Sequence, residues 1–320
     1  MPQPTSSDVH VNAPLTNISV AYLQDQTEFI ADKVFPNVPV PKRSDSYFEY
    51  QKGDWFRSEA KYRAPGTESA GSGYELSTAT YDCKVQALHK DVDDQIRANA
   101  DAPLNMDADA AEYVTRGLLL KKELDWASNY FTTGVWTGGT GGTDITPNPK
   151  WDADDSTPIA DIRKEMQAVK VNTGRKPNKL ILGEDVWAVL QDHPDFLERI
   201  TITKDKIITT SLLAAVLELE EVLIAGAVQN TANEGASDSM SYVYTKDALL
   251  VYAAPRPSLM QPSGGYTFSW TGYLGASQQG LRISRFRMDH LRSDRIEGEM
   301  AYDMKLVGAQ LGCFFDATIS

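Results

Sequence analysis

Residues Asp107–Phe131, DADAAEYVTRGLLLKKELDWASNYF, carry the strongest periodic signal in this chain of 320 residues, and the rest of the sequence is best understood around them. Apolar residues recur at helical spacing and polar residues fill the other positions, which predicts one amphipathic helix. The apolar set is Ala110, Val114, Gly117, Leu118, Leu124, Ala127 and Phe131, and the polar set is Asp109, Glu112, Arg116, Lys122, Glu123, Asp125 and Asn129.

Both ends of this predicted helix are marked in the sequence. Pro103 disfavours helix upstream, and Asn105 or Asp107 can cap the first free N–H groups. Gly134 follows the last periodic residue. About 25 residues at 1.5 Å each make a rod of roughly 37 Å, which suits a central support for a whole domain.

Composition limits the function classes. An apolar content of 42% can fill one large core or two modest ones. No apolar run reaches the ~20 residues that a bilayer requires, and Met1–Pro14 lacks a signal-peptide pattern, so we expect a soluble protein that starts in the cytosol. Cys83 and Cys313 are expected to be buried apolar residues. The net charge of −13 argues against a nucleic-acid-binding domain and suits a surface that lies near DNA without adhering to it.

The N-terminal part divides into an arm and a hairpin. Met1–Ser44 is rich in proline, with one helical stretch at Asn17–Lys33, and should be ordered by docking on its own body or on a neighbour. Ser46–Phe56 and Tyr74–Val92 read as strands, and Ala64–Gly73 between them is rich in turn formers. The simplest interpretation is a long hairpin with a flexible tip. The alternative is that both strands belong to an ordinary core sheet.

The segment Ser156–Ala254 is predicted to be a compact α+β module. Its expected helices are Thr157–Val171, Glu184–Leu190 and Ser211–Glu218, and its expected strands are Lys179–Leu182, Glu221–Ala225, Ser241–Tyr244 and Ala248–Ala253. The glycine-rich stretch before it is a linker, because no Lys-Ser or Lys-Thr follows the glycines.

The C-terminal part is expected to be rich in strands. In Leu281–Met288 the apolar parity switches, which predicts a bulge near Ser284–Arg285. Ile296–Phe315 is predicted to be one last long strand or a pair of strands.

Sequence motifs for chemistry are weak. His10, His89, His193 and His290 lack metal-site spacing, and no Gly-x-Ser-x-Gly elbow is present, so we assign no catalytic, cofactor or metal residue and expect no enzyme. One arginine cluster is open to two interpretations, as intersubunit ion pairs or as cross-strand pairs within one subunit. It comprises Arg282, Arg285, Arg287, Arg292 and Arg295, among Asp289, Asp294, Glu297 and Glu299.

Three motifs, in this order and spacing, carry a resemblance. They are Phe29–Pro36 followed by Val38-Pro39-Val40, Arg63–Glu68, and Leu180–Gly183 followed by Val186, Trp187 and Leu190. With the element order, they make the chain resemble the major capsid proteins of tailed bacteriophages, whose fold is named after phage Hong Kong 97. The resemblance covers nearly the whole chain.

The resemblance implies an α+β fold of the Hong Kong 97-like capsid type. Residues 1–44 would be the N-arm, residues 45–90 the extended E-loop hairpin, and residues 91–155 the peripheral domain with the spine helix 107–131. Residues 156–254 would be the axial domain. Residues 255–320 would be C-terminal strands that complete the peripheral domain or also contribute to the axial domain.

The resemblance also implies a function. The chain would assemble into the pentamers and hexamers of an icosahedral phage head that encloses double-stranded DNA, built in the host cytoplasm and found in the virion. Its partners would be further copies of itself, a separate scaffolding protein, a portal and a decoration protein, with non-specific DNA contact, no membrane and no cofactor. Lys52 and Lys61 lie in the hairpin where some relatives form a crosslink, but no partner asparagine can be matched.

The expected assembly interface combines hairpin residues with the arginine cluster. It comprises Tyr47, Phe48, Tyr50, Trp55, Arg57, Arg63, Glu68, Arg285, Arg287, Arg292 and Arg295. The alternatives are another phage structural protein, such as a tail-tube or decoration protein, and a cytosolic hydrolase with scattered carboxylates.

Overall fold

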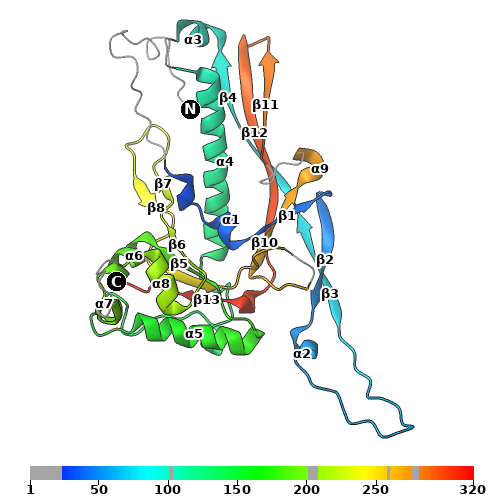
Figure 1. The fold of residues 1–320 in the computed structure, drawn as a ribbon. Helices are drawn as coiled ribbons and strands as arrows, with labels where there is room; N and C mark the ends of the chain where they lie inside the picture. The colour runs from blue at the N-terminus through cyan, green and yellow to red at the C-terminus, as the bar shows by residue number, and fades with distance from the viewer. Residues whose placement is uncertain (1–23, 101–103, 201–207, 258–259, 275–280) are drawn as a thin grey trace.

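The structure, a computed structural model that describes residues 24–100, 104–200, 208–257, 260–274 and 281–320, is an elongated body from which one hairpin projects (Figure 1). The helices are α1 (Ala31–Val34), α2 (Lys52–Trp55), α3 (Asp94–Asn99), α4 (Met106–Tyr130), α5 (Pro158–Thr173), α6 (Glu184–Gln191), α7 (Pro194–Ile200), α8 (Thr210–Leu217) and α9 (Thr271–Leu274). The strands are β1 (Asn37–Val40), β2 (Ser44–Tyr50), β3 (Leu76–Asp82), β4 (Lys84–Asp93), β5 (Lys179–Gly183), β6 (Glu221–Ala225), β7 (Val228–Asn230), β8 (Met240–Tyr242), β9 (Ala248–Val251), β10 (Gly265–Trp270), β11 (Leu281–Met288), β12 (Ser293–Leu306) and β13 (Gly312–Phe315).

The long helix α4 forms within one residue of its predicted bounds. The Asn105 side chain accepts a hydrogen bond from the Ala108 N–H at 3.2 Å, so Asn105 is the cap. Glu112 and Arg116 form the i,i+4 ion pair that their spacing allows. The helix therefore stands as one uninterrupted rod in the upper half of the molecule (Figure 1).

Two α4 residues that the sequence places on the polar face, Lys122 and Glu123, are buried. This prediction is wrong because α4 is covered on two sides. One side packs on a sheet, and the other packs on the N-terminal segment, where Lys122 forms an ion pair with Asp32. Trp126, one turn further along, is also fully buried.

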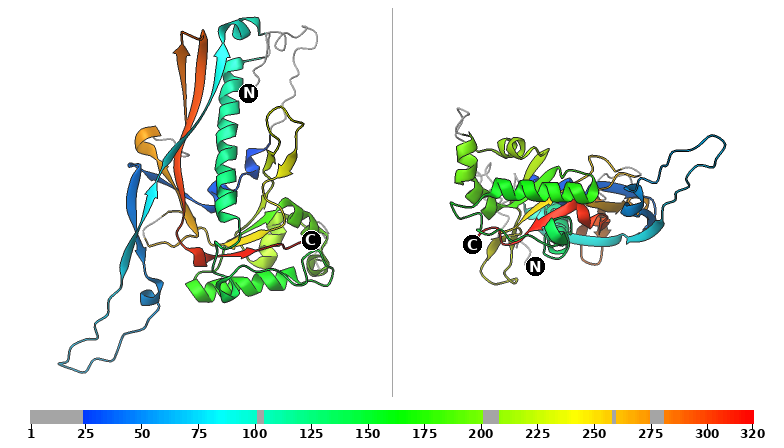
Figure 2. Two further views of the ribbon diagram at one scale, coloured as in Figure 1. Left: turned by 180° about the vertical axis from the view of Figure 1, so that it is seen from behind. Right: turned by 90° about the horizontal axis from the view of Figure 1, so that it is seen from below.

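The first sheet has the strand order β1-β10-β12-β11, and β4 pairs with β12 on the side away from β11. The helix α4 covers one face of its upper part (Figure 2). Where β12 packs against α4 it carries Gly298, at which a Cβ atom would lie 2.5 Å from Val114 Cγ1. Only a glycine lets the strand and the helix come this close without displacing side chains.

Of two C-terminal predictions, one is wrong and the other is decided between its alternatives. The bulge predicted near Ser284–Arg285 is absent, because β11 pairs with β12 residue for residue from Leu281 to Met288. As an edge strand with both faces partly exposed, β11 does not have to keep its apolar residues on one parity. The predicted strand or pair at Ile296–Phe315 is a pair, and its members β12 and β13 belong to different sheets.

The second sheet, in the order β13-β9-β5-β6, lies at the foot of α4. Its β5 and β6 are parallel, so the chain between them must cross over, and this connection contains α6, α7 and α8. Leu180 and Leu182 face a core shared with α5, α6 and α8. Ile181 faces the opposite core, which includes Trp126 of α4. The predicted helices and strands of this region all form, each within two residues of its expected bounds.

The hairpin comprises β2 and β3, paired from Ser44–Asp82 to Tyr50–Leu76. The predicted strand Tyr74–Val92 is two strands, because β3 pairs with β2 whereas β4 enters the first sheet beside β12. The first predicted strand ends early, and Trp55 lies in the short helix α2. The two interpretations of the sequence are therefore each partly right: β4 is a core strand, and β2–β3 is a ribbon outside the core sheets.

The described part of the predicted arm, residues 24–44, docks on its own body. The strand β1 pairs in parallel with β10, and Arg116 donates a hydrogen bond to the Gln24 carbonyl at 2.6 Å. Residues 17–23 of the predicted helix Asn17–Lys33 lie outside the described residues. From residue 24 onward, only a 3₁₀ turn at Gln26–Glu28 and the short α1 form. Among the described residues no helix has the length and apolar character to cross a membrane.

Candidate assembly surface

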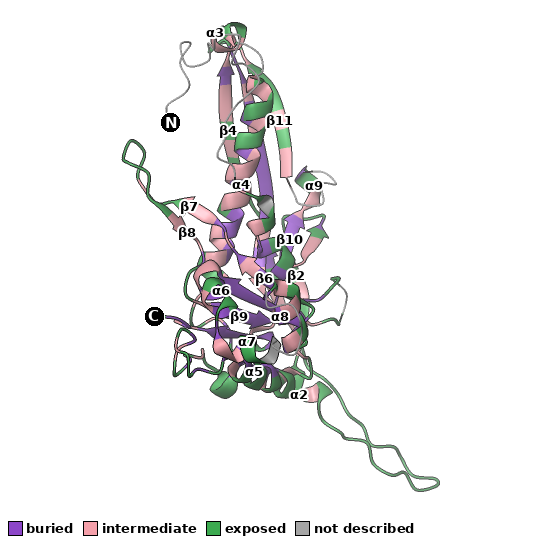
Figure 3. Ribbon diagram, turned by 60° about the vertical axis from the view of Figure 1, so that its left-hand side comes forward, coloured by how far each residue is buried: buried purple, intermediate pink, exposed green. Residues whose placement is uncertain are grey.

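Within the described residues, the projecting hairpin is the longest stretch of chain that its own body leaves exposed (Figure 3). Past Tyr50 and before Leu76 the chain runs outward, and almost every residue of this tip is exposed. Phe56 is 65% exposed and Tyr62 is fully exposed. Large aromatic side chains left in water on a thin ribbon are typical of a surface that a partner covers.

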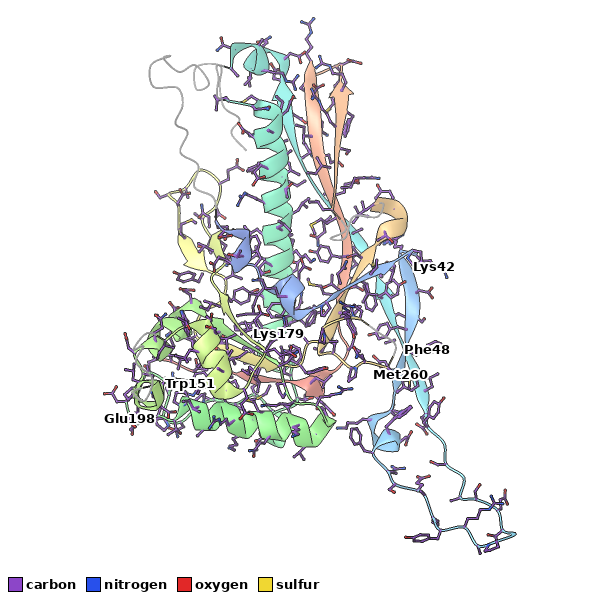
Figure 4. The ribbon with its side chains drawn as sticks, in the orientation of Figure 1. Lys42, Phe48, Trp151, Lys179, Glu198 and Met260 are labelled. Carbon is purple, nitrogen blue, oxygen red and sulfur yellow. The ribbon has the colours of Figure 1, made fainter. Side chains whose placement is uncertain are left out.

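The base of the hairpin, by contrast, is packed against the body. Tyr47 stacks on Phe268 of β10 with ring centroids 5.4 Å apart, and Tyr81 stacks on the same ring at 4.6 Å. Tyr47, one of the predicted interface residues, is therefore mainly an anchor within the subunit. Its neighbour Phe48 points to the other face of the ribbon and is 61% exposed (Figure 4).

A small aromatic cluster marks the point where the ribbon opens into the tip. Trp55 lies 5.8 Å from Tyr50 and 5.6 Å from Tyr74, measured between ring centroids. Phe56 contacts the body at Gly174, just past the end of α5. Trp55 remains about half exposed, so the predicted interface residues Tyr50 and Trp55 combine a structural contact with an open face.

The tip beyond this cluster is held by local bonds. In the turn Arg63–Glu68, the N–H and the hydroxyl group of Thr67 both donate to the Ala64 carbonyl, and Gly66 has a φ of +80°. Arg63 donates to the Thr67 carbonyl, and Glu68 is exposed. Arg57, also predicted at the interface, lies 3.9 Å from Asp54. These contacts shape the turn without fixing it to the rest of the subunit.

The predicted arginine cluster lies mostly within a network inside the subunit. At the far end of the first sheet Arg285 binds Asp294 and also lies 3.1 Å from Asp107, while Arg287 binds Asp94 and Asp294. Arg97 of α3 completes the network through Asp107 and Asp294. The pKa of Asp294 is lowered to about 2, first by the Arg285 guanidinium group and then by Arg287 and Arg97.

The remaining members of the cluster also serve the subunit itself. Arg295 of β12 forms a two-pronged pair with Asp91 of β4 at 2.7 and 2.8 Å, and Arg282 pairs with Glu299. The Arg292 carbonyl accepts from the Asp94 N–H at 3.1 Å, and its own φ is +48° in the turn between β11 and β12. Of the two interpretations left open by the sequence, the structure favours cross-strand pairing within one subunit.

One residue that matters for the arm was missed by the sequence pattern. The Glu123 carboxylate accepts hydrogen bonds from the N–H groups of Ile30 (2.8 Å) and Ala31 (3.0 Å), and from the Tyr244 hydroxyl. The Glu123 carboxylate thereby caps the first N–H groups of α1. It also links the arm to α4, which carries Glu123, and to Tyr244. Burial raises the pKa of the Glu123 carboxyl group. The sequence offers no signal for this role, since a glutamate in a long helix normally faces water.

The buried Ser156–His193 pair resembles part of a hydrolytic site but has the wrong proton arrangement. Ser156 Oγ lies 2.8 Å from His193 Nε2, and His193 Nδ1 accepts from the Asp195 N–H at 3.1 Å. An accepting Nδ1 leaves the proton on Nε2 in the neutral ring, so the ring donates toward the serine and cannot act as its base. The pair fixes the start of α7.

Other chemical signals are equally weak. Cys83 and Cys313 are buried and unpaired, as predicted, and burial raises the pKa of the Cys83 thiol to about 12. Within the described ranges no three His, Cys, Asp or Glu side chains are grouped to hold a metal ion. A cavity of about 460 Å³ beside α1 is lined by Lys33, Lys179 and Glu221, but Lys179 already binds Glu221 at 2.9 Å.

Comparison with known proteins gives a consistent result. The major capsid protein of Pseudomonas phage JBD67 is 25% identical over 277 residues, covering 84% of this chain and 85% of the relative. That of Burkholderia phage BcepMu is 22% identical over 269 residues, covering 82% and 84%. No protein-family model matches the chain.

Solved structures show the fold. A phage-related protein from Bordetella bronchiseptica RB50 superposes with a TM-score of 0.70 at 22% identity, covering 93% of this chain and 95% of the other. The capsid of cyanophage P-SCSP1u gives a TM-score of 0.63 at 10% identity, covering 96% and 91%. The chain has the α+β fold of Hong Kong 97-like phage capsid proteins, and the resemblance predicted from the three motifs is confirmed.

Proposed function

We propose that this protein is the major capsid protein of a tailed bacteriophage, which assembles into the pentamers and hexamers of an icosahedral head around double-stranded DNA. Support comes from two curated relatives, each named a major capsid protein, and from the capsid fold. The observation that carries the proposal is the projecting hairpin, whose Tyr62 and Phe48 are left mostly in water by their own subunit.

In this proposal the parts of the chain take the roles of a capsid subunit. Residues 1–44 are the N-arm, residues 45–90 the E-loop, and residues 91–155 the peripheral domain with α4 as its spine. Residues 156–254 form the axial domain, and residues 255–320 complete the peripheral domain through β10 to β12. The pairing of β13 with β9 supports a further C-terminal contribution to the axial domain.

Assembly is the mechanism. Covering one large apolar side chain stabilises a contact by about 1.5–3 kcal/mol before the cost of ordering is subtracted. Phe48, Phe56 and Tyr62 offer three such side chains on one hairpin. In a closed symmetric shell each subunit both gives and receives a hairpin, so a modest contact is repeated in every copy.

The proposal has consequences for partners and location. The protein belongs to the virion and assembles in the host cytoplasm, with a scaffolding protein, a portal and a decoration protein as partners. Its net charge of −13 supports only non-specific contact with packaged DNA, because phosphate binding depends on clustered Lys and Arg. The relatives are structural proteins, and we propose no catalytic role.

Negative-stain microscopy of the full chain, expressed alone and with the other head proteins of its phage, tests the proposal. Hollow shells are expected, and Tyr62→Ser should reduce their yield while leaving the thermal unfolding temperature of the subunit unchanged. Tyr242→Ser, at an exposed tyrosine of the separate β7–β8 hairpin, is the matched control and should assemble normally. Tubes would indicate a tail protein, and small particles under every condition would overturn the proposal.

A further inference from the structure

The lower module, defined as the second sheet with α5 to α8, has an acidic end. Asp154 and Asp155 precede α5, and Asp192 and Glu198 lie at and beyond the end of α6. The two stretches are held together, since Asp195 accepts from the Ile159 N–H at 3.1 Å and His193 binds Ser156. All four of these acidic residues are exposed, and within the described part of the chain none forms an ion pair. Figure 4 shows Glu198 at the edge of the molecule opposite the hairpin.

The other end of the lower module is basic. Lys170 lies in the last turn of α5 and Arg175 just after it, and both are exposed. Neither is paired with a carboxylate among the described residues, and Arg175 only lies over the Tyr252 ring at 5.8 Å. Lys52 at the base of the hairpin is close by, because Phe56 contacts Gly174 at the same end of α5. Lys176 is excluded from this set, since it pairs with Glu218 at 2.8 Å.

The two ends are joined by one straight element. The helix α5 has 16 residues and is therefore about 24 Å long. Seen from below, it runs from the side of the C-terminus to the side of the hairpin (Figure 2). One subunit thus presents opposite unpaired charges on surfaces that face away from each other.

We propose that the acidic end of one copy binds the basic end of the next, so that copies associate head to tail through Asp154 and Asp155 against Lys170 and Arg175. Such a heterologous contact closes into a ring when the rotation per step allows it. The inference rests on the proposed capsid function and adds to it the surfaces that set the order of copies within one ring.

Charge and composition favour a second copy over nucleic acid as the occupant. A chain with a net charge of −13 repels its copies at a distance, so a stable contact between them needs the unpaired cations of one to meet acidic groups of the other. Val171, 85% exposed, lies beside Lys170. An apolar side chain at this point suits a protein surface, and two or three cations are few for binding a phosphate backbone.

Charge reversal at each end provides the test. Variant A is Lys170→Glu/Arg175→Glu, variant B is Asp154→Lys/Asp155→Lys/Asp192→Lys/Glu198→Lys, and variant C carries all six changes. A and B each place like charges across the contact, and each should lower the yield of rings and shells about tenfold or more. C restores opposite charges and should assemble like the wild type. Lys84→Glu/Lys121→Glu, away from both ends, is the charge-matched control for A.

Mixing A with B gives a sharper result. A is acidic at both ends and B is basic at both ends, so A attracts B at each contact whereas A repels A and B repels B. A and B must therefore alternate around a ring, and only rings with an even number of subunits can close. Native mass spectrometry should show hexamers with three copies of each variant and no pentamers.

Normal assembly of A and B alone would overturn this inference and leave the proposed function intact. Failure of C to assemble, although circular dichroism shows C to be folded, would also overturn it. Loss of DNA retention by A in shells of normal yield would assign the basic end to nucleic acid instead. Absence of assembly in the wild type would refute the proposed function itself.

Discussion

At the scale of single residues, Glu123 determines how the arm is attached. Replacing it with alanine leaves the buried N–H groups of Ile30 and Ala31 without an acceptor, and each such loss costs about 1–3 kcal/mol. We expect Glu123→Ala to lower the free energy of unfolding by about 3 kcal/mol. Urea unfolding followed by tryptophan fluorescence measures the change.

Two variants bracket this prediction. Glu123→Gln keeps one acceptor oxygen and should lose less stability than Glu123→Ala. Glu112→Ala, on the open side of the same helix, removes only the exposed pair with Arg116 and should stay within about 0.5 kcal/mol of the wild type. If Glu112→Ala and Glu123→Ala were equally mild, Glu123 would not be the anchor of the arm.

The lowered pKa of Asp294 predicts part of the loss of folding stability at acid pH. Its pKa falls from the ordinary 3.8 to about 2 in the folded state because of Arg285 first and of Arg287 and Arg97 next. A group whose pKa is lower in the folded state stabilises it above the unfolded pKa. This contribution is therefore complete above about pH 4 and is lost as the pH falls toward 2. The thermal unfolding temperature of Asp294→Asn should accordingly be lower than that of the wild type at pH 7, with the two curves converging near pH 2. A constant difference across this range would contradict the assignment.

Single residues are also where the sequence was least informative. Whether Arg285 and Arg287 meet carboxylates of their own subunit or of a neighbour depends on how β11, β12 and α3 come together, which spacing along the chain does not reveal. Burial of Glu123 depends likewise on an arm 92 residues away in sequence. A pattern of polar and apolar residues detects the face that a helix turns to a sheet, and it misses a second covering element.

At the scale of elements, the closeness of α4 and β12 predicts a specific weakness. A side chain at Gly298 would meet Val114 and Leu118, with a Cβ atom 2.5 and 2.9 Å from their methyl groups. We expect Gly298→Val to destabilise the subunit by about 1–3 kcal/mol, because the helix must move off the sheet. The shift in the midpoint of urea unfolding measures it. Gly53→Ala is the control, since nothing lies within 4 Å of that position.

Elements whose ends or apolar runs are marked in the sequence were predicted well. The helix α4 and the strands β5 and β6 have caps, glycines or apolar runs that are visible without tertiary context. Short elements such as α3 and β7 have too few residues for a period to show. The junction at Cys83 was missed for another reason: both β3 and β4 favour extended backbone, and only their different partners separate them.

At the scale of the whole molecule, the projecting hairpin could be predicted from the sequence, and the side of it that stays open could not. Aromatic residues flanking a glycine-rich stretch indicate a ribbon that needs a partner, and the ribbon projects as expected. The sequence does not reveal which face of the ribbon is exposed, because that depends on the packing of Tyr47 and Tyr81 against Phe268. The sequence therefore marks the hairpin, and the structure distinguishes its anchored base from its open tip.

This division between base and tip leads to the last prediction. Trp55 and Tyr74 lie close together at the start and end of the tip, with ring centroids 5.6 Å apart, so a short Gly-Ser linker can replace residues 57–73. Because the tip is held by local bonds, the shortened subunit should unfold at the same temperature as the full chain. It should nevertheless fail to form shells, as followed by sedimentation and microscopy.

Replacing the exposed loop 232–238 between β7 and β8 in the same way controls for loss of an exposed loop and should leave assembly unchanged. Shells of normal yield from the shortened chain would show that copies associate through other surfaces. A fall in the unfolding temperature would show instead that the tip supports its own subunit, and the exposed aromatics would then need a different explanation.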